Sequence, residues 1–103
     1  MKFLVVTKAK MFPPPEMAMA LLNAVDAWVK KYKSSGKLEQ VWGFAGLQGG
    51  GGIGNVNSLE EFDEIMAEFP WAPFSETEIY GLVDFDISQK HQRQAMDAMM
   101  PPK

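Results

Sequence analysis

The chain has 103 residues, of which 10 are basic and 13 acidic, so its formal net charge is −3, and it contains no cysteine. This length suits one domain. The missing cysteines exclude disulfides and thiolate metal sites, and the acidic balance argues against a nucleic-acid surface. No apolar run approaches the roughly 20 residues of a membrane span, and MKFLVVTKAK is too short and too rich in lysine for a secretion signal. We expect a cytoplasmic protein that binds neither nucleic acid nor membrane.

The first third of the chain predicts a strand followed by a long helix. Residues 2–8 are β-branched and aromatic, as in a buried strand. Three prolines at 13–15 form a stiff connector, and Pro15 can serve as the first helical residue. Over residues 16–34 apolar side chains recur every three or four positions, which predicts one helical face: Met17, Leu21, Ala24, Val25, Trp28 and Tyr32. Gly36 supplies the left-handed conformation that ends helices.

The middle of the chain predicts two strands joined by a glycine turn. Residues 38–47 alternate with apolar side chains on both faces, which indicates a strand covered on both sides. The glycine run 49–52 lacks the lysine and hydroxyl residue of a phosphate-binding loop, and a strand rather than a helix follows it. We therefore interpret this run as a hairpin turn. Residues 53–57 form the short returning strand.

A second helix and a last strand follow. Ser58 with Glu61 is a capping box, and apolar residues follow at helical spacing: Leu59, Phe62, Ile65, Met66 and Phe69. Pro70 and Pro73 predict a rigid corner. Residues 76–85 alternate again and predict a strand.

The order of elements predicts an α+β protein of the ferredoxin-like type, β-α-β-β-α-β, with a four-stranded antiparallel sheet and both helices on one face. The second sheet face remains to be covered, and by parity it carries Gln40, Trp42, Phe44, Glu76, Tyr80 and Leu82. Such an apolar face is typical of an interface or a ligand groove. A homodimer with facing sheets would cover it and enclose a lumen. Residues 87–100 predict a tail helix, capped by Ser88, with no obvious partner within the monomer.

Residues 35–82 also carry a set of features at the spacing of a known family. The set comprises the helix end Ser35–Lys37, then Trp42, Gly46, Ile53, Val56, Ser58, Glu61, Pro70, Pro73, Glu78 and Leu82. With these features the segment resembles the muconolactone isomerase-like family of dimeric α+β barrel proteins. The resemblance implies a barrel-type dimer over residues 1–86, often assembled into larger rings, with a tail, residues 87–103, that packs on a neighbouring subunit.

The resemblance also implies a function. Family members hold a small, planar, oxygenated molecule between the sheet and the first helix, and shift a double bond in a lactone by proton transfer without metal or organic cofactor. We therefore expect no cofactor here. The first helix departs from the pattern, because it offers Leu22, Val25 and Trp28 toward the pocket where the isomerases offer charged residues.

Candidate catalytic residues cluster on the last strand and in the tail. Glu76, Glu78 and Tyr80 alternate, so their side chains emerge on one face about 7 Å apart. A carboxylate in an apolar lumen suits proton transfer, and Glu78 also matches the family's pattern. The alternative is that both glutamates are solvent-facing charges guarding an edge strand. His91, the single histidine, is either a lid over a partner's pocket or an ordinary surface residue.

Candidate ligand-binding residues are mostly aromatic. Trp42, Phe44 and Tyr80 could stack on a flat ligand or pack the dimer core. Trp28 of the first helix is a further candidate for contact with the ligand. Lys37 could anchor an anionic ligand or only cap the helix, and Asn55 is the polar member of the third strand. One histidine and scattered carboxylates offer no metal-ligand spacing, so we expect no metal.

Three functions are open from the sequence. The first is a cofactor-independent isomerase of a small cyclic or aromatic-derived oxygenated acid, with a pocket carboxylate transferring the proton. The second is a cofactor-independent monooxygenase that relies on Trp42, Asn55 and Tyr80. The third is a non-catalytic small-ligand binder or an oligomeric interaction module, which the apolar first helix favours.

Overall fold

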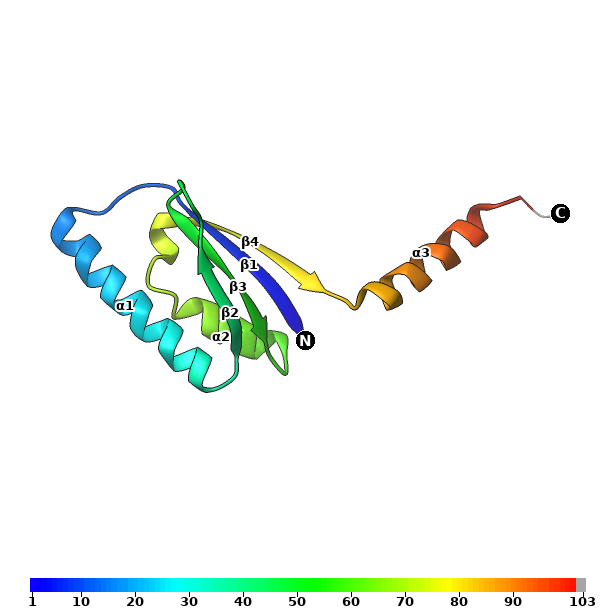
Figure 1. The fold of residues 1–103 in the computed structure, drawn as a ribbon, viewed down its shortest axis with the longest axis horizontal. Helices are drawn as coiled ribbons and strands as arrows, with labels where there is room; N and C mark the ends of the chain where they lie inside the picture. The colour runs from blue at the N-terminus through cyan, green and yellow to red at the C-terminus, as the bar shows by residue number, and fades with distance from the viewer. Residues whose placement is uncertain (102–103) are drawn as a thin grey trace.

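The computed structural model describes residues 1–101, in which four strands and two helices form the body and a third helix follows. The elements are β1 (Lys2–Ala9), α1 (Pro15–Ser34), β2 (Leu38–Gly43), β3 (Gly49–Asn55), α2 (Leu59–Ala67), the 3₁₀ turn η1 (Ala72–Phe74), β4 (Ser75–Leu82) and α3 (Phe85–Met99). Figure 1 shows α1 and α2 on one side of the sheet. The predicted β-α-β-β-α-β order and the α+β class are confirmed.

The sheet has the strand order β2-β3-β1-β4, and all its neighbours are antiparallel. Residues directly opposite one another share a face, so the register assigns each strand residue to one of the two faces of the sheet. The face toward the helices carries Phe3, Val5, Thr7, Leu38, Val41 and Ile79. The other face, which we call the open face, carries Leu4, Val6, Gln40, Trp42, Ile53 and Tyr80. The predicted grouping of Gln40, Trp42, Glu76, Tyr80 and Leu82 is confirmed. Phe44 follows the end of β2 at Gly43, and its ring lies beside Trp42 over the same face, since a Cβ on Gly51 would stand 3.5 Å from the Phe44 ring and 3.3 Å from the Trp42 indole nitrogen.

The prediction for the glycine run was wrong. Gly49 to Gly52 lie within β3, and the turn is made by residues 44–48. The physical reason is close backbone approach, since a Cβ on Gly50 would stand 2.7 Å from the carbonyl oxygen of Trp42. A Cβ on Gly52 would stand 2.9 Å from that of Gln40. Any larger residue would push β2 and β3 apart.

The predicted helix boundaries of the body are confirmed. Pro15 opens α1, and Gly36 follows its end with φ of +80°. At α2, the Glu61 N–H donates to the Ser58 hydroxyl oxygen at 3.1 Å, and the Asn57 N–H donates to the Glu61 carboxylate at 3.2 Å. These caps fix where each helix starts and stops, and with them the position of the helices over the sheet.

The core is small and lies at the C-terminal end of α1. Its buried members are Tyr32, Leu38, Val56 and Ile65, with Phe3, Trp28 and Phe62 packed against them. The rings of Phe3 and Phe62 stack with centroids 4.4 Å apart. Toward its other end α1 diverges from the sheet (Figure 1), and Met17, Met19 and Leu22 stay exposed there. This divergence opens space between the helix layer and the sheet.

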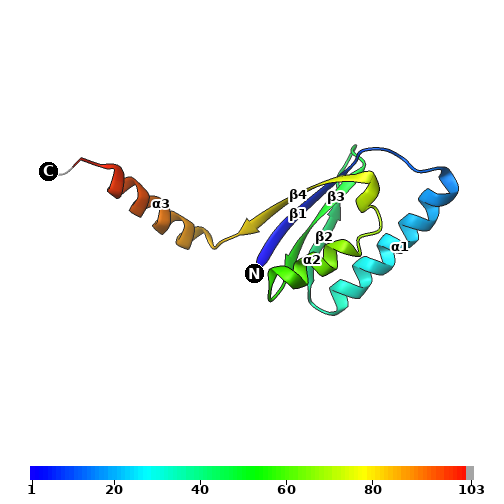
Figure 2. The same ribbon diagram turned by 180° about the vertical axis from the view of Figure 1, so that it is seen from behind.

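Helix α3 extends away from the body, as both ribbon views show (Figures 1 and 2). The described chain is consequently elongated, with extents of 69 × 28 × 23 Å. The predicted tail helix is confirmed, but it begins at Phe85 rather than at residue 87. Ser88 therefore lies inside the helix and does not cap it; its N–H donates to the Asp84 carbonyl at 3.0 Å. Among residues 1–101 no helix combines the length and the apolar character needed to cross a membrane.

Candidate ligand-binding site

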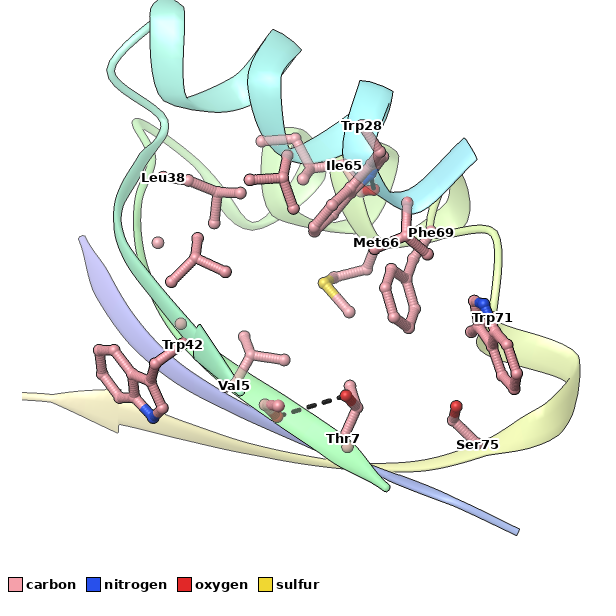
Figure 3. Close-up of a pocket in the computed structure, with 18 of the residues that line it drawn as sticks. Val5, Thr7, Trp28, Leu38, Trp42, Ile65, Met66, Phe69, Trp71 and Ser75 are labelled. Carbon is pink, nitrogen blue, oxygen red and sulfur yellow. Dashed lines mark hydrogen bonds between the residues drawn. The ribbon is translucent and has the colours of Figure 1, made fainter. Parts of the chain in front are cut away.

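A cavity of about 520 Å³ lies between the sheet and the two helices of the body (Figure 3). This volume falls within the range of small-molecule sites in proteins, roughly 300–1,000 Å³. Strand β1 contributes Val5 and Thr7, whose parity turns them toward the helices. Glycines 50, 52 and 54 of β3 form a floor without side chains. The cavity therefore exists because α1 diverges from the sheet while β3 carries nothing that could fill the space.

The helices supply an apolar and aromatic roof. Leu22, Val25 and Trp28 line the cavity from α1, as the resemblance led us to expect. Helix α2 and the segment after it add Phe62, Ile65, Met66 and Phe69. The indole N–H of Trp28 donates to the carbonyl oxygen of Ile65 at 3.0 Å, and its ring lies 5.1 Å from that of Phe69. These contacts hold the aromatic roof in one orientation.

Few polar groups reach the cavity. The Thr7 hydroxyl donates to the Gly50 carbonyl oxygen at 3.3 Å. The Trp71 Nε1 is buried and meets no hydrogen-bond partner within residues 1–101. Lys37, a cavity residue, forms an ion pair of 2.9 Å with Glu61. That lysine and the Asn57 N–H hold the pKa of the Glu61 carboxyl below its usual value.

The predicted ligand-binding residues divide between the cavity and other places. Trp28, Lys37 and Trp42 line it, although Trp42 belongs by register to the open face and is 41% exposed. Phe44 and Asn55 are not among the lining residues. The Asn55 side-chain amide instead donates to the Glu39 carboxylate at 2.9 Å.

The predicted catalytic residues do not line the cavity. Glu76, Glu78 and Tyr80 lie together on the open face, and all three are exposed. The Tyr80 hydroxyl donates to the Glu78 carboxylate at 2.6 Å, and this bond raises the pKa of Tyr80. Glu76 pairs with Lys10 at 3.4 Å. His91 is exposed on α3, which extends away from the body (Figure 1).

Comparison with known protein families identifies the family of this chain. The family model for muconolactone delta-isomerase matches residues 1–88. The chain belongs to the muconolactone delta-isomerase family. The match includes β1 and α1, which the sequence resemblance over residues 35–82 did not cover, and ends within the first turns of α3.

Solved structures share the fold of this delta-isomerase family member. The crystal structure of muconolactone isomerase matches with a TM-score of 0.74 and 23% identity, covering 80% of this chain and 88% of that one. A 5-chloro-2-hydroxyhydroquinone dehydrochlorinase from Burkholderia phenoliruptrix, in complex with 2,5-dihydroxybenzoquinone, matches with a TM-score of 0.64 and 18% identity. That match covers 81% of this chain and 94% of the dehydrochlorinase. A search among curated proteins gave no match.

Some cavity residues of this family member were not predicted as a site. The sequence assigned Phe62, Met66 and Phe69 to the packed face of a helix, and Trp71 to a proline corner. An indole with a donor to satisfy, placed between two prolines, was the available signal for Trp71. Residues 1–101 contain no cluster of three or more histidine, aspartate or glutamate side chains suited to a metal ion.

Proposed function

We propose that the protein binds a small, planar, oxygenated cyclic compound in the cavity between the sheet and α1. The cavity itself carries this proposal, because its volume and its aromatic roof suit a flat ring. Two further facts support it. The family is named for an enzyme of a lactone, and the dehydrochlorinase that shares the fold was solved with a dihydroxybenzoquinone. Both ligands are small oxygenated rings.

Cofactor-independent isomerisation by proton transfer is a second candidate, which family membership favours. A general base or acid must lie within hydrogen-bond reach of the proton that moves. Within one copy of the chain, Glu78 and Tyr80 lie on the open face rather than beside the cavity. Their catalytic role, and that of Glu76 and His91, therefore stays a prediction that requires a second copy to complete the site. The monooxygenase alternative has no observation in its favour.

We propose a second copy of this chain as the partner of the open face and of α3. Trp42, Tyr80 and Leu82 are exposed on the open face, and Phe85, Met96 and Met99 on α3. Exposed apolar groups of this extent are typical of an interface. A facing sheet from another copy would cover the first three, and a neighbouring body would cover α3, in keeping with the barrel-type assembly expected from the resemblance.

The binding proposal is tested by ligand-observed NMR and calorimetry with a panel of small rings. The panel contains muconolactone, 2,5-dihydroxybenzoquinone, 1-indanone and 1,4-naphthoquinone. We expect Val25→Phe, which places a larger side chain into the cavity, to abolish binding of the panel members that the native protein binds. Ala27→Phe is the matched control, since it adds the same ring on the exposed side of α1. A folded protein that binds no panel member, or binding that survives Val25→Phe, would contradict the proposal.

A further inference from the structure

We propose that the cavity binds a ring that carries a hydroxyl group, and that this hydroxyl lies between Thr7 and Ser75. It donates a hydrogen bond to the Thr7 oxygen and accepts one from the Ser75 hydroxyl. This inference rests on the proposed function, because it assumes that the cavity is a ligand site. It goes further in naming the polar group of the ligand, the two residues that bind it and the orientation of the ring.

The side chains that line the cavity differ between its two ends. Thr7 and Ser75 stand at one end, below Trp71, and Leu38 and Ile65 stand at the other (Figure 3). Leu38 and Ile65 belong to the buried core, whereas Thr7 and Ser75 are only half-buried. In a largely apolar pocket, a small number of placed polar groups fixes the orientation of the ligand. A ligand oxygen therefore belongs at the Thr7 end, and the hydrocarbon part of the ring belongs at the core end.

The charged residue of the lining offers no competing anchor at the core end. Lys37 directly precedes Leu38, and its ammonium pairs with the Glu61 carboxylate at 2.9 Å. Both side chains are less than one-third exposed, and Glu61 also accepts the Asn57 N–H at 3.2 Å. A ligand oxygen placed here would have to disrupt this pair or stay unpaired, and either outcome costs free energy.

The Thr7 hydroxyl can only accept a hydrogen bond from a ligand. Its single hydrogen is donated to the Gly50 carbonyl oxygen on the neighbouring strand at 3.3 Å, the bond drawn in Figure 3. A threonine hydroxyl has one donor and two lone pairs, so lone pairs are what Thr7 has left to offer. The ligand must therefore supply the hydrogen. A hydroxyl group does so, whereas a ketone or an ether does not.

Ser75 lies close enough to Thr7 for both to contact the same ligand oxygen. Strand pairing sets Ser75 opposite Ala9 and Thr77 opposite Thr7, so Ser75 and Thr7 are diagonal neighbours on one face of the sheet. Such neighbours are about 7–8 Å apart, and their side chains come closer. Two hydrogen bonds of about 2.8 Å that meet at one oxygen suit this separation. Because the Ser75 hydroxyl can donate, a ligand hydroxyl satisfies both residues.

Three probes test this inference by calorimetry and ligand-observed NMR at pH 7: 5-indanol, 5-methoxyindane and indane. The first offers a donor and an acceptor, the second only an acceptor, and the third neither. One hydrogen bond changes an affinity by roughly two- to tenfold. We therefore expect 5-indanol to bind about tenfold more tightly than indane, and 5-methoxyindane to bind with an intermediate affinity.

Four variants separate the roles of the two hydroxyls. Thr7→Val removes the acceptor with little change of shape and should weaken binding of 5-indanol about fivefold, without weakening the other two probes. Ser75→Ala should weaken both oxygen-bearing probes. Thr7→Ser keeps the hydroxyl and should retain the preference for 5-indanol. Thr77→Val is the matched control, because it makes the same change at the exposed residue opposite Thr7, which does not line the cavity; it should alter no affinity.

Each contrary outcome has a distinct meaning. If 5-indanol binds no more tightly than indane, the inference about the ligand hydroxyl is wrong, and if Thr7→Val preserves the preference, Thr7 is not its acceptor. Either result would leave the proposed function standing as long as Val25→Phe abolishes binding. Failure of all three probes and of the whole panel would overturn the proposed function and this inference together. The ranking of the probes in the native protein stands as a test even if Thr7→Val does not fold.

Discussion

The indole N–H of Trp28 on α1 donates a hydrogen bond of 3.0 Å to the main-chain carbonyl of Ile65 on α2. The two residues are 37 positions apart in the chain, and their bond joins the two helices that roof the cavity. Trp28 also lines the cavity and packs against Phe69. One side chain therefore forms part of the binding surface and fixes the spacing of the elements around it.

Replacing Trp28 with Phe keeps an aromatic ring in the roof but removes this hydrogen bond. We expect the free energy of unfolding to fall by about 1 kcal/mol, the net value of such a bond together with a small loss of packing. Urea denaturation followed by circular dichroism measures it. Trp42→Phe, at a half-exposed position, is the matched control and should cost less than about 0.5 kcal/mol. Equal costs for the two variants would show that the Trp28–Ile65 bond contributes nothing of its own.

A second contact between α1 and α2 predicts how the free energy of unfolding changes at acidic pH. The Tyr32 hydroxyl and then the Lys31 ammonium hydrogen-bond to the Glu68 carboxylate and lower its pKa below the usual 4.5. A depressed carboxyl pKa contributes stability that is present above pH 4.5 and lost as the pH falls through the folded-state value. We expect Glu68→Gln to flatten the decline of unfolding free energy below pH 4.5. Glu64→Gln, at an exposed position of α2, the helix that Glu68 caps, should leave the decline unchanged. A decline unaltered by Glu68→Gln would refute the assignment.

Both tyrosines of the chain affect how stability changes at alkaline pH. Hydrogen bonds to the carboxylates of Glu68 and Glu78 raise the pKa of Tyr32 and of Tyr80, respectively, above the usual 10.0. A raised pKa contributes stability that is complete below pH 10 and lost as the pH rises through the folded-state value. We expect ultraviolet titration of the native protein to show both phenols ionising above pH 10.

The carboxylate partners provide the control for this titration. In a Tyr32→Phe background only Tyr80 remains, so Glu78→Gln should bring its titration midpoint down toward 10.0. Glu76→Gln, two residues earlier on β4, should not shift it. If Glu78→Gln leaves the titration midpoint of Tyr80 unchanged, the 2.6 Å hydrogen bond between Tyr80 and Glu78 does not form in solution.

The sequence predicted the fold where the information is local. Ser58 and Glu61 specified the start of α2, Gly36 marked the end of α1, and alternation sorted Gln40, Trp42 and Tyr80 onto one face. Local information was misleading for the glycine run, because glycine is typical of turns. Its actual role at Gly50 is to admit the Trp42 carbonyl, a contact that only the strand pairing creates.

The candidate site was less predictable because it depends on distances between layers. Parity could say which side chains share a face, but not that α1 diverges from the sheet and opens a cavity on the helix side. The sequence therefore placed the candidate chemistry on Glu78 and Tyr80 and gave Trp71 no role. Three of the α1 residues that line the cavity, Leu22, Val25 and Trp28, were expected there from the resemblance, whereas Val29 was not.

Replacing Gly50 and Gly54 of β3 with alanine should have different effects on the free energy of unfolding. A Cβ on Gly50 would stand 2.7 Å from the Trp42 carbonyl oxygen, whereas a Cβ on Gly54 would come no closer than 3.7 Å to any heavy atom outside its neighbours. Gly50→Ala should therefore cost about 1–3 kcal/mol through forced backbone movement. Gly54→Ala should be nearly neutral, because a β-strand accepts alanine at a position with room. Urea denaturation compares them, and a neutral Gly50→Ala would contradict the close-approach explanation of β3.

The last prediction concerns what covers α3. Phe85, Met96 and Met99 lie at helical spacing along one side of it and are exposed by 73%, 61% and 77%. The charged residues Asp86, Lys90, Arg93 and Asp97 lie along an adjacent side of the helix. If another copy of the chain covers the apolar side, Met96→Lys places an ammonium group into that contact. Removing this charge from water costs free energy and weakens the association. We expect this variant to reduce the molar mass measured by light scattering at tens of micromolar protein. Gln94→Lys adds the same charge to the same helix on a different side and should preserve the mass of the native assembly. A native protein that is already monomeric, or a Met96→Lys variant with the native mass, would mean that a second copy is not the partner of this surface.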